Sequence, residues 1–292
     1  MRGALAAALL RHVKNRDIYG IVLEAAQAPG GAAVFCLGND APAAVTSDPR
    51  AELTEAAAGL WRIDRCGKPF VSLLDGPVYG AGLGLVLQGT HRVAGDTTTL
   101  AASEGMAGGL SFVLPRLQRG LGLYLALSGR PIDRALAYHS GLVTHCIDSA
   151  SFPEIRERLA QADPIDEVLD GLHRDPAPSP LSPHLDAIKS CFAADSPAGI
   201  VRALEEWTGP SAAWAGLLAH DIFRRSERDL DVVHRFFTGS PPNRLRDALA
   251  REFRVAMNRL SLPADVAIDA LFASPIGADL ELPPEPKAPS IS

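Results

Sequence analysis

The chain has 292 residues, of which 47% are apolar and 21% are charged, and its formal net charge is −6. This composition excludes a disordered chain, and a negative balance without a basic tract argues against a nucleic-acid-binding protein. No apolar run reaches the roughly 18 residues that a membrane-spanning helix needs. The scattered cysteines lack CxxC spacing, which predicts reduced thiols and a cytoplasmic protein. They are Cys36, Cys66, Cys146 and Cys191.

The start of the chain is basic, with Arg2, Arg11 and Lys14 and no acidic residue before Asp17. Such a pattern allows a targeting peptide, but the apolar stretch 4–10 is short and is followed by basic residues where small ones mark cleavage. We favour a first amphipathic helix that leads into a buried strand, with the targeting peptide as the open alternative.

Short apolar runs separated by glycine-rich turns and short helices fill the sequence up to about residue 150. Most are apolar on both faces, which is typical of buried parallel strands in an α/β protein. The runs are residues 18–24, 33–37, 69–74, 91–95, 97–102 and 142–148.

After residue 150 the pattern changes to helices with recognisable starts. Ser196 followed by Pro197 is typical of a helix cap and first helical position, Ser226 opens a second helix, and Asn243 precedes a third. The apolar residues of the third follow a helical period: Leu245, Leu249, Phe253, Met257 and Leu260. We therefore predict a core domain at 1–150, a helical region at 151–274 and a Pro-rich tail at 275–292.

Two glycine turns in the first half are candidates for ligand binding. Residues 35–40 (FCLGND) leave a strand through a turn, and Asp40 is able to cap a helix that begins after it. Residues 75–85 (DGPVYGAGLGL) pass from a strand through a glycine-dense turn into an apolar helix. Glycines let the backbone approach a ligand closely, and the start of a helix points free N–H groups outward.

A single carboxylate, Glu104, comes directly after a third segment, TLAAS at residues 99–103. Its neighbours are small or apolar. Such surroundings raise the pKa of a carboxyl group, which suits a general base.

These segments resemble the crotonase (enoyl-CoA hydratase/isomerase) superfamily, and within it most closely the 3-hydroxyisobutyryl-CoA hydrolase branch. The resemblance extends over roughly residues 5–270. The runs that carry it are KPFVSLLDGPVYGAGLGLVLQGTHRVAGDTTTLAASE, VLPRLQRGLGLYLALSGRPID, GLVTHCID, CFAADSPAGIVRALEEW and LRDALAREFRVAM.

The resemblance implies an α/β fold with the ββα spiral core of the ClpP/crotonase type, a helical C-terminal region, and chemistry on a coenzyme A thioester. In the family two backbone N–H groups hold the thioester oxyanion, and the matching positions here are Leu37 and Ala81. Glu104 matches the carboxylate that attacks the thioester or activates water. The other positions placed around the substrate are Gly38, Asp40, Gly80 and Gly82.

The hydrolases and the hydratases each use a second carboxylate beside the one matched by Glu104, and this sequence lacks both. The hydrolase branch continues from its glutamate through a Gly-Leu-Phe-Pro-Asp run that ends in a second acid, and this run is missing after Glu104. The hydratases' other glutamate is replaced by Gly84. No Asp or Glu stands between Glu104 and Asp133 as a substitute. Loss of a proton-transfer partner typically lowers a rate by about 10² to 10⁴.

The resemblance therefore implies hydrolysis of a short 3-hydroxyacyl-CoA, as in valine catabolism. The alternatives are an enoyl-CoA hydratase or isomerase, and a catalytically impaired member that binds acyl-CoA. Coenzyme A would be part of the substrate, with no separate cofactor and no metal, and self-association into a homo-oligomer is expected. The branch has a strand ahead of its first helix, whereas this sequence starts at that helix. We therefore expect the strand at 18–24 to expose the edge that the earlier strand would cover.

Two further groups favour structural interpretations. His145 and Cys146 are adjacent on a predicted strand, so their side chains point to opposite faces and cannot act as a pair. The arginines at 224, 225 and 228 allow contact with coenzyme A phosphates, but a solvated helix face is the simpler interpretation.

Overall fold

A parallel sheet of four strands forms the centre of the protein. The computed structural model describes residues 2–13, 15–26, 33–38, 48–102, 106–118, 120–273 and 280–284. The strands pair in the order β1-β2-β4-β7, and all three pairings are parallel. Their bounds are Ile21–Glu24 for β1, Phe70–Leu74 for β2, His91–Ala94 for β4 and His145–Cys146 for β7. The prediction of parallel strands is confirmed for these four, whereas the run predicted at 33–37 forms only an isolated bridge at Cys36.

The strands differ in burial as their positions in the sheet require. All five residues of the inner strand β2 are buried. The outer strand β1 alternates between half-buried and exposed residues, and Val22 is 39% exposed. Among the described strands, β1 pairs with β2 alone, and the exposed edge expected at this strand stays a prediction.

A second sheet of three strands connects the two glycine turns. It consists of β3 (Pro77–Tyr79), β5 (Thr99–Ala101) and β6 (Ile132–Asp133), with β3 parallel and β6 antiparallel to β5. The sequence predicts β5 but neither of the others: β3 lies inside the glycine-dense segment, and β6 has only two residues. An isolated parallel bridge joins Cys36 to Val78 of β3, which places the first glycine turn beside the second.

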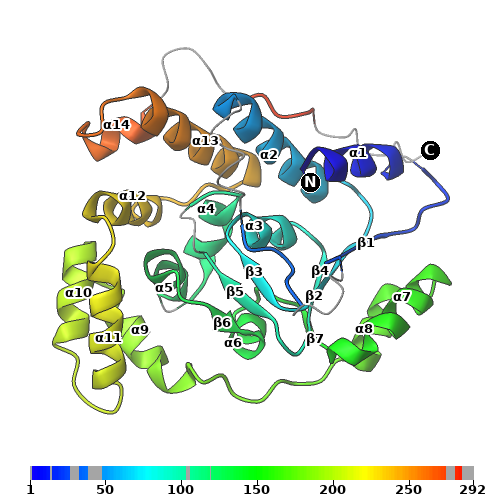
Figure 1. Ribbon diagram of the computed structural model, residues 1–292, viewed down its shortest axis with the longest axis horizontal. Coiled ribbons are helices and arrows are strands. Elements are labelled where there is room, and N and C mark those ends of the chain that lie inside the picture. Colours follow the sequence, from blue (N-terminus) through cyan, green and yellow to red (C-terminus); the bar gives the residue numbers. More distant parts are fainter. Residues whose placement is uncertain are drawn as a thin grey trace.

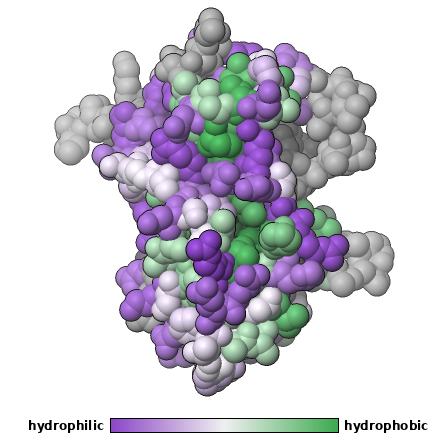
Figure 2. Space-filling view, turned by 90° about the vertical axis from the view of Figure 1, so that its left-hand side faces the viewer, coloured by the Kyte–Doolittle hydropathy of each residue, from purple (hydrophilic) through white to green (hydrophobic). Residues whose placement is uncertain are grey.

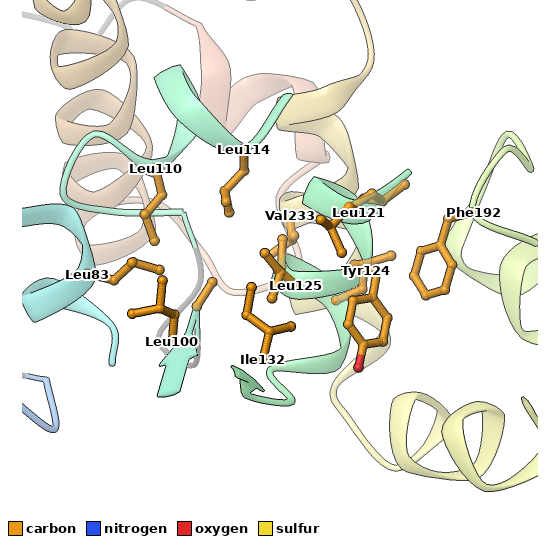
Figure 3. Packing of buried hydrophobic residues seen from close by; sticks show 14 of the residues in the cluster. Leu83, Leu100, Leu110, Leu114, Leu121, Tyr124, Leu125, Ile132, Phe192 and Val233 are labelled. Atoms are coloured by element: carbon orange, nitrogen blue, oxygen red, sulfur yellow. The ribbon is translucent and has the colours of Figure 1, made fainter. Parts of the chain in front are cut away.

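The main core lies between this second sheet and a group of short helices. Leucines of α3 (Ala81–Leu87), α4 (Leu110–Val113), the 3-10 turn η2 (Leu114–Arg116) and α5 (Leu121–Ser128) meet Leu100 of β5 and Ile132 of β6 (Figure 3). Phe192 and Val233 from the second half of the chain complete the cluster. The helical region is therefore packed into the same core as the first half.

Helices after residue 150 surround the sheets on several sides (Figure 1). On the face of the parallel sheet turned away from the main core, α7 and α8 cover Val71, Leu73 and Val93 with apolar side chains. On another side, α10 and α11 form a pair beside α12, while α13 lies beside α2 and α14 packs on α13. The remaining bounds are α1 Arg2–His12, α2 Pro49–Asp64, α6 Arg134–His139, η3 Ser149–Ser151, α7 Phe152–Ala160, α8 Ile165–Leu172, η4 Ser182–His184, α9 Leu185–Cys191, α10 Pro197–Glu205, α11 Ala212–Phe223, α12 Glu227–Phe237, α13 Leu245–Ser261 and α14 Ile268–Phe272.

Helix α2 packs against segments from near both ends of the chain, namely α1 and residues 280–284. The α1 side chain of Leu9 is buried in a cluster with Ile63 of α2. Near the other end, the indole Nε1 of Trp61 donates a hydrogen bond of 2.9 Å to the carbonyl oxygen of Pro283, and Leu282 packs in the α2–α13 cluster. The domain boundaries drawn from the sequence stay a prediction.

Figure 2 views the face made by α10, α11, α12 and α14, where apolar patches lie among mostly hydrophilic residues. Leu217 and Phe223 of α11 are among the most exposed large apolar side chains, at 65% and 75%. Within the described ranges, no helix combines the length and the apolar character needed to cross a membrane.

Candidate active site

The two predicted glycine turns are in direct contact. A Cβ built at Gly82 would lie 2.4 Å from the Cβ and 2.8 Å from the Sγ of Cys36, so only a glycine permits this approach. Three backbone hydrogen bonds fix the first turn on β3: the N–H groups of Phe35 and Cys36 donate to the Pro77 oxygen at 3.2 and 3.0 Å, and Tyr79 N–H donates to the Cys36 oxygen at 2.8 Å. The structure thus brings together the segments that the sequence separates by about forty residues.

The two predicted oxyanion donors have no hydrogen-bond acceptor among the described residues. Ala81 is the first residue of α3, so its N–H has no partner within the helix. Within the described part of the chain, neither this N–H nor that of Leu37 has a hydrogen-bond acceptor. Gly80 caps the helix with φ 52° and ψ −118°, a conformation that requires glycine, whereas Ala81 has no positive φ and fits without strain.

A cavity of about 510 Å³ opens at these turns, within the size range of small-molecule sites. Cys36, Gly38, Ala81 and Gly82 line it, whereas Gly80 is buried outside the lining and the Leu37 side chain is 61% exposed. Most of the remaining lining is apolar and comes from α1, α2, α3, α12 and α13. The helical region therefore supplies one wall of the site.

Two predicted site residues, Asp40 and Glu104, lie outside the described residues. Residues 106–108, which come shortly after Glu104 in the sequence, line the cavity. Ala101 and Ala102, shortly before it, are buried at the end of β5. The catalytic role of Glu104 stays a prediction that the resemblance implies.

Gly84 has a structural reason to be a glycine. A Cβ at this position would lie 2.3 Å from the carbonyl oxygen and 2.9 Å from the Cα of Gly108. The segment that comes after Glu104 therefore packs directly on α3, at the position that the resemblance matches with the hydratases' second glutamate. This contact excludes any side chain at position 84 in the present backbone conformation.

The cavity lining contains five charged residues: Glu55, Arg225, Asp229, Glu252 and Arg259. Asp229 and Arg259 form an ion pair with each other. Arg225 donates a 2.7 Å hydrogen bond to the Leu127 oxygen, and Arg228 donates one of 2.6 Å to the Val266 oxygen. Both arginines thus donate hydrogen bonds to backbone carbonyl oxygens. Of the two, only Arg225 lines the cavity.

Glu252 of α13 is a site residue that the sequence interpretation missed. Its side chain is buried, and Oε2 and Oε1 accept hydrogen bonds of 2.8 Å from the N–H groups of Gly109 and Ser111. Burial raises the pKa of the Glu252 carboxyl to about 7, although the hydrogen bonds from Ser111 and Gly109 oppose this shift. A group that titrates near neutrality beside a cavity is a candidate for proton transfer.

The adjacent His145 and Cys146 have separate partners, as predicted. His145 Nε2 lies 3.1 Å from Oδ1 of Asp170 on α8, whereas Cys146 Sγ faces the Arg134 oxygen at 3.7 Å. Burial raises the pKa of the Cys146 thiol to about 11, which makes it a poor nucleophile. Among the described residues, no group of three or more His, Cys, Asp or Glu side chains is arranged to hold a metal ion.

Comparisons with known proteins agree with this geometry. The mitochondrial 3-hydroxyisobutyryl-CoA hydrolase of Xenopus tropicalis is 31% identical over 204 residues, which are 65% of this chain and 52% of that protein. The mouse protein of the same name is 29% identical over 268 residues, 83% of this chain and 66% of its own. The chain thus spans about half to two thirds of the length of these relatives.

Among solved structures, a carnitinyl-CoA dehydratase from Mycobacterium thermoresistibile superposes with a TM-score of 0.83 at 27% identity. The match covers 96% of this chain and 91% of the dehydratase. This similarity confirms the crotonase fold with its helical C-terminal region. The family profile described as enoyl-CoA hydratase/isomerase matches residues 1–268, and the chain belongs to that family.

Proposed function

We propose that this protein hydrolyses the coenzyme A thioester of a short 3-hydroxyacyl group. The observation that carries the proposal is the pair of N–H groups at Leu37 and Ala81, which have no acceptor among the described residues and lie on two turns in contact at one mostly apolar cavity. The names of the curated relatives support a 3-hydroxyisobutyryl-CoA substrate, and with it a role in valine catabolism.

In this proposal the thioester carbonyl oxygen accepts hydrogen bonds from both N–H groups. These donors stabilise the negative charge that develops on the oxygen when the carbonyl carbon is attacked, and each is typically worth about 3 kcal/mol. Glu104 attacks the carbon itself or removes a proton from an attacking water. The carbon–sulfur bond then breaks, and the products are the free acid and coenzyme A thiol.

The alternative is addition of water to an enoyl-CoA, or the reverse elimination. The carnitinyl-CoA dehydratase with the same fold supports this reaction class. The contact between Gly84 and Gly108 argues against it, since the hydratases' second glutamate has no room at this position. A third possibility, binding of acyl-CoA without turnover, rests on the missing second acid after Glu104.

Thiol release from a panel of acyl-CoA esters tests the proposal, with Glu104→Gln as the matched variant. Release that Glu104→Gln abolishes supports the hydrolase, with an expected fall in rate of about 10² or more. Loss of enoyl absorbance without thiol would show a hydratase instead. Saturable binding without either activity would show a protein that binds acyl-CoA without turnover. If no acyl-CoA binds, the whole proposal is refuted.

The cytoplasmic location and the homo-oligomer expected from the sequence stay predictions. The two relatives are named as mitochondrial proteins, and that location applies to them alone. Sedimentation of the purified protein would establish its oligomeric state.

A further inference from the structure

Glu252 is the carboxyl group with the most unusual surroundings among the described residues of the cavity. It lies on α13, is only 6% exposed, and lines the same cavity as Ala81 and Gly82. Each of its carboxylate oxygens accepts one backbone N–H, from Gly109 or Ser111. Since a carboxylate offers about four lone-pair positions, it retains capacity for a further hydrogen bond.

No described cation pairs with this carboxylate. Arg251, the adjacent residue on α13, donates its hydrogen bonds to the carbonyl oxygens of Phe236 and Arg235. An unpaired buried carboxylate is unfavourable, and such groups concentrate at functional sites. Its two acceptor oxygens also satisfy the Gly109 and Ser111 N–H groups, which an apolar side chain would leave without a partner.

The other charged residues that line the cavity balance in sign, and Arg251, the adjacent cation on α13, lowers the pKa of the Glu252 carboxyl. Helix α2 contributes Glu55 to the cavity wall; Arg225 precedes α12, and Asp229 on α12 is paired with Arg259 of α13. The α4 segment LSFV carries no ionisable side chain. Burial is therefore the main cause that raises the pKa of the Glu252 carboxyl to about 7, so neutral and ionised forms are both available at physiological pH.

The position of Glu252 relative to the rest of the site is set by the chain just after Glu104. Residues 106–108 line the cavity, Gly108 packs on Gly84, and Gly109 donates to Glu252. The carboxyl group therefore adjoins the segment in which the hydrolase branch carries its second acid. It reaches this place from the helical region, 148 positions further along the sequence.

We propose that Glu252 is the second acid of the site and protonates the departing thiolate. This inference rests on the proposed function. In the balanced step, water adds its oxygen to the carbonyl carbon and gives a proton to Glu104. The carbon–sulfur bond breaks, its electron pair leaves with sulfur, and sulfur takes the proton of Glu252. The proton held by Glu104 returns to Glu252 through solvent, so the enzyme is restored.

The test is the effect of Glu252→Gln on two thioesters with the same acyl group. One is the coenzyme A ester, whose alkyl thiolate needs a proton to leave; the other is an aryl thioester, whose thiolate leaves unprotonated. We expect Glu252→Gln to lower kcat on the coenzyme A ester by about 10² to 10⁴ and to spare the aryl ester largely. Glu157→Gln on the surface of α7 serves as the matched control, with kcat unchanged on both.

The wild-type pH profile provides a measurement that does not depend on the variant folding. Because Glu252 must be protonated to act, kcat on the coenzyme A ester should fall as the pH rises through about 7, and this limb should vanish with the aryl ester. A merely structural role would slow both esters equally and leave no such difference between their profiles.

The outcomes separate the two proposals. Thiol release by the wild type with equal losses on both esters, or with no loss in Glu252→Gln, overturns the inference about Glu252 alone. Absence of thiol release from any acyl-CoA by the wild type overturns the proposed function and the inference together. Selective loss on the coenzyme A ester, with the aryl ester retained, supports both.

Discussion

The contact between Gly84 and Gly108 allows a direct test of how the site is built. In Gly84→Ala the new Cβ would lie 2.3 Å from the Gly108 oxygen, 2.9 Å from its Cα and 3.0 Å from its carbonyl carbon. All three neighbours are backbone atoms, so relief requires the segment 106–109 to move. Forcing a methyl group into a packed core costs about 1–3 kcal/mol. We therefore expect Gly84→Ala to lower the free energy of unfolding by that amount.

Gly216→Ala is the matched control, because it makes the same substitution inside helix α11. A Cβ there meets nothing within 4 Å, and its φ is not positive. Alanine inside a helix stabilises by about 0.4–1 kcal/mol relative to glycine, so the two variants should differ by about 1.4–4 kcal/mol in urea unfolding. Thiol release should fall in Gly84→Ala and persist in Gly216→Ala. Equal stability and equal activity of the two variants would refute the packing argument.

Two further predictions concern stability. Trp61→Phe removes the indole hydrogen bond to the Pro283 oxygen and should cost about 1 kcal/mol in urea unfolding, whereas Trp207→Phe, without a described indole hydrogen bond, should cost less; equal costs would contradict the role of this contact. Burial lowers the pKa of His145, so the unfolded chain binds its proton more tightly and the free energy of unfolding should fall as the pH drops below about 6.5. The slope between pH 7.5 and 5.5 should be smaller in His145→Asn, and an unchanged slope would assign the effect to other groups.

The contact between Gly84 and Gly108 also limits which larger side chains position 84 can hold. Gly84→Glu would place a carboxylate at the position that the resemblance matches with the hydratases' second glutamate. The backbone of Gly108 occupies that space, so the glutamate would displace the segment instead of entering the cavity. A glutamate at position 84 would therefore require the Gly108 segment to move.

The glycine turns were predictable because their chemistry is local. A strand that ends in a turn and a helix that begins with Gly-Ala-Gly can be read from neighbouring residues, and the resemblance supplies their pairing. Strand β3 was not predictable in this way. Its three residues, Pro77–Tyr79, lie inside a glycine-rich segment and become a strand only because Thr99–Ala101 and Cys36 pair with them. Such long-range pairing leaves no periodicity in the sequence.

Glu252 shows that the helical pattern of α13 contains more information than its apolar residues alone. It stands seven residues after Leu245 and three after Leu249, and both leucines are buried on α13. Residues at these spacings share one face of a helix, so the apolar face of α13 had to contain a carboxyl group. The sequence therefore carried the signal that an acid enters the core from the helical region. The sequence could not predict that Glu252 accepts hydrogen bonds from Gly109 and Ser111. Those N–H groups lie more than 140 residues away and meet Glu252 only in the folded protein.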